Sequence, residues 1–155
     1  MAGELSAEML AEILAGTLEE AAFVFTEVAD PAPPFEGDVL QARLTYAGAH
    51  QGELLLALSA DFAVSLAGNL LGEEEEASGR EQDATGELLN MIAGTVATEL
   101  FGHDAGCKLG LPSVARVAPK AHLAELAKAT AVASVVDEEG RRIDLSATVR
   151  EGAAP

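Results

Sequence analysis

The order of apolar and polar residues predicts two long amphipathic helices separated by half-buried strands. Apolar side chains recur at the helical period from Ser6, a residue suited to capping a helix, to about Phe25. The residues that form this apolar side are Leu10, Ile13, Leu14, Thr17, Leu18 and Ala21. Proline cannot continue a helix, so Pro31–Pro34 indicates an exposed connector after it.

Strict alternation of apolar and polar residues follows, which is typical of strands with one buried face. It predicts a strand over Val39–Ala47, a turn from Gly48 to Gly52 and a returning strand over Glu53–Ser59. A short amphipathic helix is expected over Ala60–Leu71, ended by Gly72. The next residues, Glu73–Glu76, are expected to form a solvated loop rather than a cation site.

A second long helix is predicted to begin at Ser78-Gly-Arg-Glu81, which matches a capping box, and to run to Phe101 and end at Gly102. A short strand is expected over Val114–Val117. The pattern then predicts a hairpin of Lys128–Asp137 and Arg142–Arg150. The expected fold class is α+β, with two long helices packed on an antiparallel sheet.

The two long helices resemble each other. Met9–Phe23 and Glu87–Phe101 align without gaps at an offset of 78 residues and share an Ala-Gly-Thr triplet. We therefore expect a single domain over residues 1–155, built from duplicated halves at about 6–72 and 78–150. Chance similarity between two helices rich in Ala and Leu is the alternative interpretation.

Composition excludes several classes of protein. The 155 residues are 49% hydrophobic and carry a formal net charge of −17, which argues against binding nucleic-acid phosphates or an anionic membrane through bulk charge. No apolar run approaches the about 20 residues of a membrane-spanning helix, and the N-terminus lacks the pattern of an export signal, so a cytoplasmic protein is expected.

Common catalytic motifs are absent from the sequence. The single cysteine, Cys107, rules out an internal disulfide and is interpreted as structural or incidental. His50, His103 and His122 lack the spacing of a helical metal pair and are expected at the surface or in loops, with no metal bound. No nucleophile elbow, Walker loop or dinucleotide-binding turn occurs.

The second long helix carries the candidate chemistry. Its apolar side, expected to pack on the sheet, consists of Thr85, Leu88, Leu89, Ile92, Val96 and Leu100. The opposite side places Glu87 and Asn90 next to each other, because residues three apart share a helix face. The rest of that side and its flank, interpreted as a partner-binding surface, consists of Asp83, Gly86, Met91, Gly94, Ala97, Thr98 and Phe101.

Small and apolar residues are unusual on a solvated helix face. Gly94 weakens a helix by about 1 kcal/mol relative to Ala, with Gly86 adding to this, but both leave the backbone open to close approach. A carboxamide such as that of Asn90 can orient a water, as a Gln does in phosphoryl hydrolysis. Taken alone, however, the Glu-x-x-Asn spacing is also typical of an ordinary polar helix surface.

A family resemblance adds weight to the catalytic interpretation. The stretch Asp83–Gly94 resembles the signature helix of the CheC/CheX/FliY phosphatases of bacterial chemotaxis. Leu44–Gly72 and Gly110–Val117, with its Leu111-Pro112-Ser113, resemble the corresponding segments of CheX. The likeness covers residues 8–150. Because Met9 and Glu12 replace the motif in the first helix, the single-site CheX-like form is the closer match.

The resemblance implies a phosphatase that hydrolyses the aspartyl phosphate of a CheY-type receiver domain. It assigns Glu87 to the contact with the receiver's active-site lysine and Asn90 to positioning the hydrolytic water. It also implies that this chain binds no cofactor of its own, that the receiver holds the Mg²⁺, and that two copies form a homodimer.

Two other functions stay open at this point. A non-catalytic adaptor would use the same helix face to bind a phosphorylated receiver domain without shortening the lifetime of the phosphoryl group. A dimerisation module with no phosphoryl partner is the third interpretation, and it predicts that binding does not depend on Glu87 or Asn90.

Overall fold

The computed structural model describes residues 5–48, 51–71, 79–101 and 108–150. Their helices are α1 (Ala7–Ala22), α2 (Ala60–Leu71), α4 (Glu81–Phe101) and α5 (Pro119–Leu126). Their strands are β1 (Thr26–Val28), β2 (Val39–Ala47), β3 (Gln51–Ser59), β4 (Lys108–Leu109), β5 (Ser113–Val117), β6 (Ala131–Asp137) and β7 (Arg142–Arg150). The α+β class with helices on an antiparallel sheet is confirmed, and α2 has the predicted bounds.

The sheet has seven strands in the order β1-β6-β7-β3-β2, and both β4 and β5 pair with the outer side of β2. Both predicted hairpins are present, and the pairing of β3 with β7 joins them at the centre of the sheet. All of these pairings are antiparallel. The last hairpin begins at Ala131 rather than at Lys128 as predicted, because a helix and turn occupy the preceding residues.

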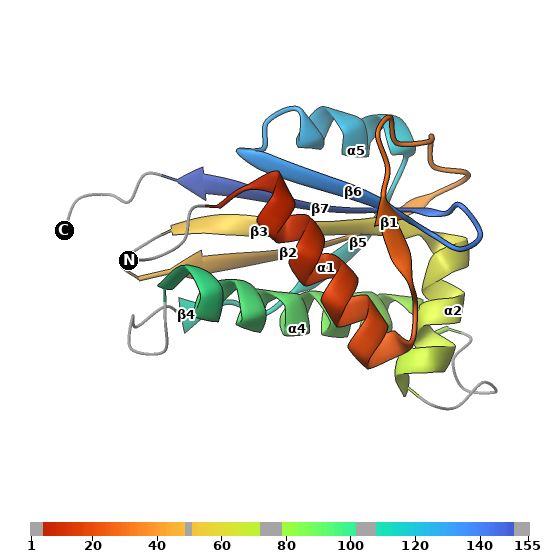
Figure 1. Ribbon diagram of the computed structural model, residues 1–155, viewed down its shortest axis with the longest axis horizontal. Helices are drawn as coiled ribbons and strands as arrows, with labels where there is room; N and C mark the ends of the chain where they lie inside the picture. Colours follow the sequence, from red (N-terminus) through yellow and green to blue (C-terminus); the bar gives the residue numbers. More distant parts are fainter. Residues whose placement is uncertain (1–4, 49–50, 72–78, 102–107, 151–155) are drawn as a thin grey trace.

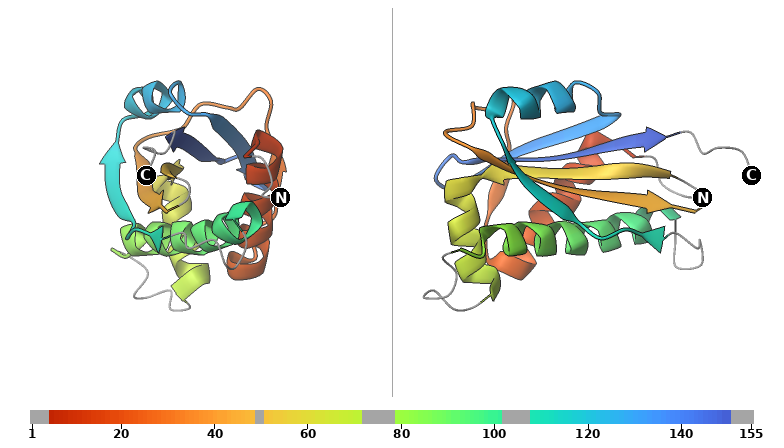
Figure 2. Two further views of the ribbon diagram at one scale, coloured as in Figure 1. Left: turned by 90° about the vertical axis from the view of Figure 1, so that its left-hand side faces the viewer. Right: turned by 180° about the vertical axis from the view of Figure 1, so that it is seen from behind.

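Each long helix packs on the hairpin of the other half of the chain. Helix α1 lies on β6 and β7, whereas α4 lies on β2 and β3 and also contacts α1 and α2 (Figure 1). These three helices cover one face of the sheet, and α5 lies on the opposite face (Figure 2). Each long helix therefore packs on strands from the other half of the chain, and the β3–β7 pairing joins the two hairpins into one sheet.

The main core lies between the sheet and the three helices. Every residue predicted to form the packing side of α4 is buried, from Thr85 to Leu100. Thr85 satisfies its hydroxyl by donating to the carbonyl oxygen of Glu81, at 2.7 Å. Leu40, Leu56 and Leu145 face this core from three neighbouring strands. The face of α4 turned away from the core is thereby fixed.

Helix α1 begins as predicted but ends three residues early. The Ser6 hydroxyl accepts a hydrogen bond from the Met9 amide, at 3.1 Å, and caps the helix. At the other end Phe23 has a φ of 58°, and the amide of Val24 donates to the carbonyl of Leu18 at 3.1 Å, which closes the helix. The chain then forms the short strand β1, which the sequence pattern did not predict.

His122 corrects the expectation that the histidines lie at the surface or in loops. It sits on α5, a helix also missed from the sequence, and its side chain is fully buried. Its Nε2 donates to Asp144 Oδ2 and its Nδ1 accepts from Gln41 Nε2, both at 2.8 Å. The polar side of β7 therefore points into a buried network beneath α5 rather than into solvent.

Several predictions fall outside the described residues. They concern the acidic run Glu73–Glu76, the capping residue Ser78, the helix end at Gly102, and the side chains of His50, His103, Cys107 and Phe101. None of the helices in the described ranges is long and apolar enough to cross a membrane.

Candidate functional site

The outward face of α4 presents a carboxylate and a carboxamide side by side. Glu87 and Asn90 are both exposed and lie one turn apart on the same face. Within the described part of the chain, neither side chain makes a hydrogen bond or an ion pair, so both keep their full bonding capacity for a partner or a water.

A shallow hollow of about 470 Å³ opens beside these two residues. Its lining comes from α4 and from the start of β5: Gln82, Asp83, Gly86, Glu87, Asn90, Pro112 and Val114. The hollow is open enough for a protein surface to enter. Its lining contains two carboxylates and no Lys, Arg or His, so a positively charged group is the electrostatic complement of this site.

Gly86 differs from the sequence-based picture. It is buried, and a Cβ built on it would lie 3.4 Å from Val114 Cγ2 and 3.7 Å from Pro112 Cγ. The β5 segment therefore covers this flank of the helix, and a Cβ at residue 86 would be in ordinary van der Waals contact with it. Gly94 does leave the helix surface open, because nothing lies within 4 Å of a Cβ built there.

The remaining predicted partner-binding residues lie along the same helix. Asp83 is exposed and its carboxylate lies 3.5 Å from Arg80 Nε, while Met91 and Thr98 are exposed and Ala97 is half-buried. Thr98 donates its hydroxyl proton to the Gly94 carbonyl, at 3.0 Å. Asp83, Gly86, Glu87 and Asn90 are gathered around the hollow, whereas the others extend beyond it towards the end of the helix.

A hydrogen bond of Glu81 holds the start of helix α4. The Glu81 carboxylate accepts a hydrogen bond from the amide of Gly79, at 3.0 Å. This bond, together with one from its own amide, lowers the pKa of Glu81. The predicted capping box is not formed, because the helix begins at Glu81 and Gly79 has a φ of 91°, so the residue directly before the helix is Arg80. The residues that α4 contributes to the hollow therefore lie within about three turns of the helix start.

Sequence reasoning missed part of the hollow. Gln82, Pro112 and Val114 were not proposed as site residues, although they line it. The signal was present in Leu111-Pro112-Ser113, which the family resemblance singled out, but nothing in the pattern showed that this segment lies against Gly86. The contact joins residues far apart in sequence.

The place on α1 that corresponds to Asn90 of α4 is occupied by an acidic residue. A groove between α1 and α4 is lined by Met9, Glu12, Ile13, Gly16, Thr17, Glu20, Thr95 and Glu99. Glu12 occupies the place that Asn90 has in the second helix, so this groove carries no carboxamide that could orient a water.

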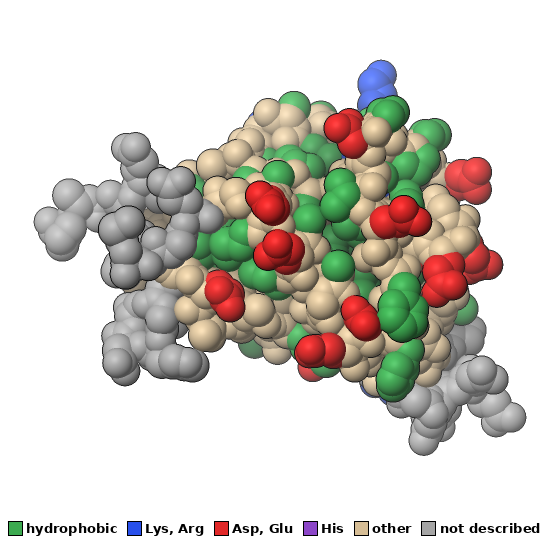
Figure 3. Space-filling view, viewed as in Figure 1, with side chains coloured by type: hydrophobic (Ala, Val, Ile, Leu, Met, Phe, Trp, Pro, Cys, Tyr) green, Lys and Arg blue, Asp and Glu red, His purple; other side chains and the backbone are tan. Residues whose placement is uncertain are grey.

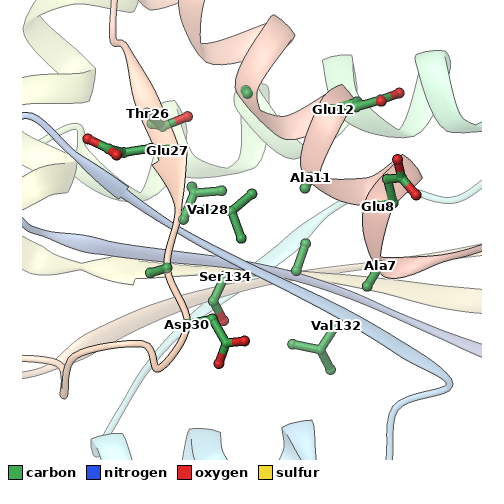
Figure 4. Close-up of a pocket in the computed structure, with 14 residues that line it drawn as sticks. Ala7, Glu8, Ala11, Glu12, Thr26, Glu27, Val28, Asp30, Val132 and Ser134 are labelled. Atoms are coloured by element: carbon green, nitrogen blue, oxygen red, sulfur yellow. The ribbon is translucent and has the colours of Figure 1, made fainter.

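A larger groove, of about 650 Å³, lies elsewhere, between α1, β1 and β6 (Figure 4). Its floor is apolar, with Ala11, Val28 and Val132 among its lining, and its carboxylates are Glu8, Glu12, Glu27 and Asp30. Figure 3 shows acidic side chains on either side of a hydrophobic patch on this face. In the described ranges, no group of three or more His, Cys, Asp or Glu side chains is placed to hold a metal ion.

Comparisons with known proteins agree with this architecture. The family model described as "Chemotaxis phosphatase CheX" matches residues 40–137. No curated protein matches the chain. Among solved structures, a chemotaxis protein CheX from Desulfovibrio desulfuricans is similar with a TM-score of 0.65 and 16% identity, covering 93% of this chain and 98% of that one.

Two further structures extend the likeness. A CheX–CheY–BeF3–Mg complex from Borrelia burgdorferi matches with a TM-score of 0.66 and 17% identity, over 93% of this chain and 97% of that one. Thermotoga maritima FliY matches with a TM-score of 0.55 and 17% identity, over 94% and 89%. At these identities the structures show a shared fold.

Proposed function

Because the chain belongs to the CheX family of chemotaxis phosphatases, we propose that it hydrolyses the aspartyl phosphate of a CheY-like receiver domain. The observation that carries the proposal is the pair Glu87 and Asn90, exposed on one face of α4 beside an open hollow and free of hydrogen bonds within the described residues. The Borrelia burgdorferi relative crystallised with CheY supports a receiver domain as the partner.

Asn90 acts in this proposal by holding the attacking water. Its carboxamide has both donor and acceptor groups, so it can fix the water's orientation, but it is too weak a base to remove a proton. The water oxygen attacks phosphorus and the bond between phosphorus and the receiver's aspartate oxygen breaks. The aspartate leaves as a carboxylate, and both protons of the water end on the released phosphate, as H2PO4⁻.

Glu87 binds rather than reacts. Its carboxylate pairs with a lysine ammonium of the receiver's active site and so fixes the angle at which Asn90 enters. The Mg²⁺ that neutralises the phosphoryl oxygens is held by the receiver's own acidic pocket. With this partner, we also propose a cytoplasmic location.

The test is the rate of phosphoryl loss from a phosphorylated receiver domain. Wild type, Glu87→Ala, Asn90→Ala and the matched control Glu12→Ala, at the corresponding place on α1, are compared at equal concentration. We expect Asn90→Ala to lower kcat by about 100-fold, the usual effect of losing one positioning group, and Glu12→Ala to retain wild-type activity. Equal rates for wild type and Asn90→Ala contradict the catalytic role, and binding without acceleration favours the adaptor.

We also propose that two copies associate through the β6 edge of the sheet. Strand β1 pairs only with Val135–Asp137, so no described strand lies beside residues 131–133 on that side. The apolar groove adjoins this uncovered edge (Figure 4). An unpaired strand edge beside apolar side chains favours addition of another strand. Sedimentation velocity at increasing concentration measures the association.

A further inference from the structure

Leu111 is the most exposed large hydrophobic residue in the described part of the chain, with a relative exposure of 91%. A loop leucine usually turns towards the protein, because leaving its apolar surface in water is unfavourable. Its sequence neighbour Pro112 forms one wall of the hollow that contains Glu87 and Asn90, so the backbone of Leu111 lies next to that wall.

The backbone on both sides of Leu111 is held in place. On one side the Gly110 amide donates to the Thr45 carbonyl at 2.8 Å. A Cβ at Gly110 would lie only 3.1 Å from Thr45 Oγ1, so this close contact depends on glycine. On the other side Pro112 packs against Gly86 of α4. The leucine is therefore presented outward by a fixed segment.

A second exposed apolar residue lies on the other side of the candidate pair. At about 100° per residue, Gly86 and Met91 fall on opposite sides of Glu87 around the helix. The β5 segment packs at Gly86, and Met91 is 36% exposed. The segment that carries Leu111 and the residue Met91 therefore lie on opposite sides of Glu87 around the helix.

We propose that Leu111 is the apolar anchor that seats the receiver domain over Glu87 and Asn90, with Met91 as its counterpart across the site. This inference rests on the proposed function. The chain carries a net charge of −17, so long-range attraction to a receiver with an acidic active-site pocket is not available. Apolar contact at the rim supplies the affinity, and the partner's matching feature is an apolar patch beside its phosphorylated aspartate.

The test compares Leu111→Gln with Leu123→Gln, a control on α5, on the other face of the sheet, where the leucine is 47% exposed. Each variant is titrated with the phosphorylated receiver and, separately, with the receiver activated by beryllofluoride. Transfer of an exposed leucine into an interface predicts binding weaker by about tenfold or more for Leu111→Gln. KM rises while kcat at saturation stays at the wild-type value, and Leu123→Gln matches wild type.

The outcomes separate this inference from the proposed function. If wild type accelerates phosphoryl loss and Leu111→Gln does so with the same KM, the proposed role of Leu111 is wrong and the proposed phosphatase function is supported. If wild type binds the activated receiver through Leu111 without accelerating the reaction, the anchor stands and the phosphatase is wrong. Absence of binding by wild type overturns both. A change in sedimentation with Leu111→Gln assigns the leucine to contact between copies and overturns the anchor.

Discussion

The buried network beneath α5 gives a prediction whose magnitude follows from its contacts. The Asp144 carboxylate is fully buried and accepts hydrogen bonds from His122 Nε2 at 2.8 Å, Ser134 Oγ at 2.7 Å and Arg142 Nε at 2.8 Å. The substitution Asp144→Asn keeps the size and shape of the side chain but removes its negative charge. The new NH2 group is a hydrogen-bond donor, and it faces side chains that are themselves donors. The Arg142 guanidinium, largely buried, then has no anionic partner in the network.

The expected loss in unfolding free energy is about 3–5 kcal/mol, the usual cost of removing one member of a buried ion pair. Arg142 retains its hydrogen bond to the Pro33 carbonyl and its position over the Phe35 ring, which places the loss nearer the lower end. The matched control is Asp38→Asn. Its exposed carboxylate lies 3.4 Å from exposed Arg116, and such pairs contribute at most about 1 kcal/mol.

The same network predicts a dependence on pH. Burial raises the pKa of Asp144, but the hydrogen bonds from His122, Arg142 and Ser134 outweigh burial and hold the pKa below its ordinary value. The contribution of the Asp144 carboxylate to the stability of the folded protein is therefore complete above the unfolded-state pKa of about 3.9. It is lost as the pH falls through the lower folded-state pKa.

The assay is urea unfolding of wild type and the two variants at pH 7 and at steps down to about pH 3, below the ordinary aspartate pKa. The difference between wild type and Asp144→Asn should shrink as the pH falls. A difference under about 1 kcal/mol at pH 7, no larger than an exposed pair gives, or one that does not narrow in acid, refutes the reasoning.

Two further predictions use residues of the helices and the sheet edge. Gly94→Ala and its counterpart Gly16→Ala should each raise the free energy of unfolding by up to about 1 kcal/mol, because a Cβ meets nothing within 4 Å at either glycine. Only Gly94→Ala should weaken binding of the receiver domain. Unchanged affinity of the Gly94→Ala variant would show that the partner does not approach the helix backbone at this residue. Association of two copies through the groove brings Glu8, Glu27 and Asp30 near those of a second copy, so the dimer should strengthen between low and high salt in sedimentation experiments; weakening by salt would contradict that interface.

The elements with strong periodicity were predictable from the sequence, and those held by distant contacts were not. Strand β2 has the predicted bounds because alternating residues of Val39–Ala47 face the core. Strand β1 has only three residues, too few for a pattern, and it exists through its pairing with β6. Helix α5 has a weak apolar side and is held by the polar contacts of His122.

The site divides in the same way. The outward position of Glu87 and Asn90 follows from helical period alone and could be predicted. The wall formed by Pro112 and Val114 could not, because it depends on β5 pairing with β2 and packing against Gly86. Gly86 itself was interpreted as a surface glycine because the helical period does not show which segment lies over a flank.

The packing of each long helix on strands from the other half of the chain constrains the order of folding during synthesis. The apolar side of α1, from Leu10 to Leu18, packs in part on β6 and β7, which follow all the other described elements along the chain. A nascent chain that ends before residue 131 therefore lacks the part of the sheet on which α1 packs, although it already contains α2 and α4, which also contact α1. The docking of α1 on the sheet therefore waits for β6 and β7, and the long sequence separation of these contacts slows it.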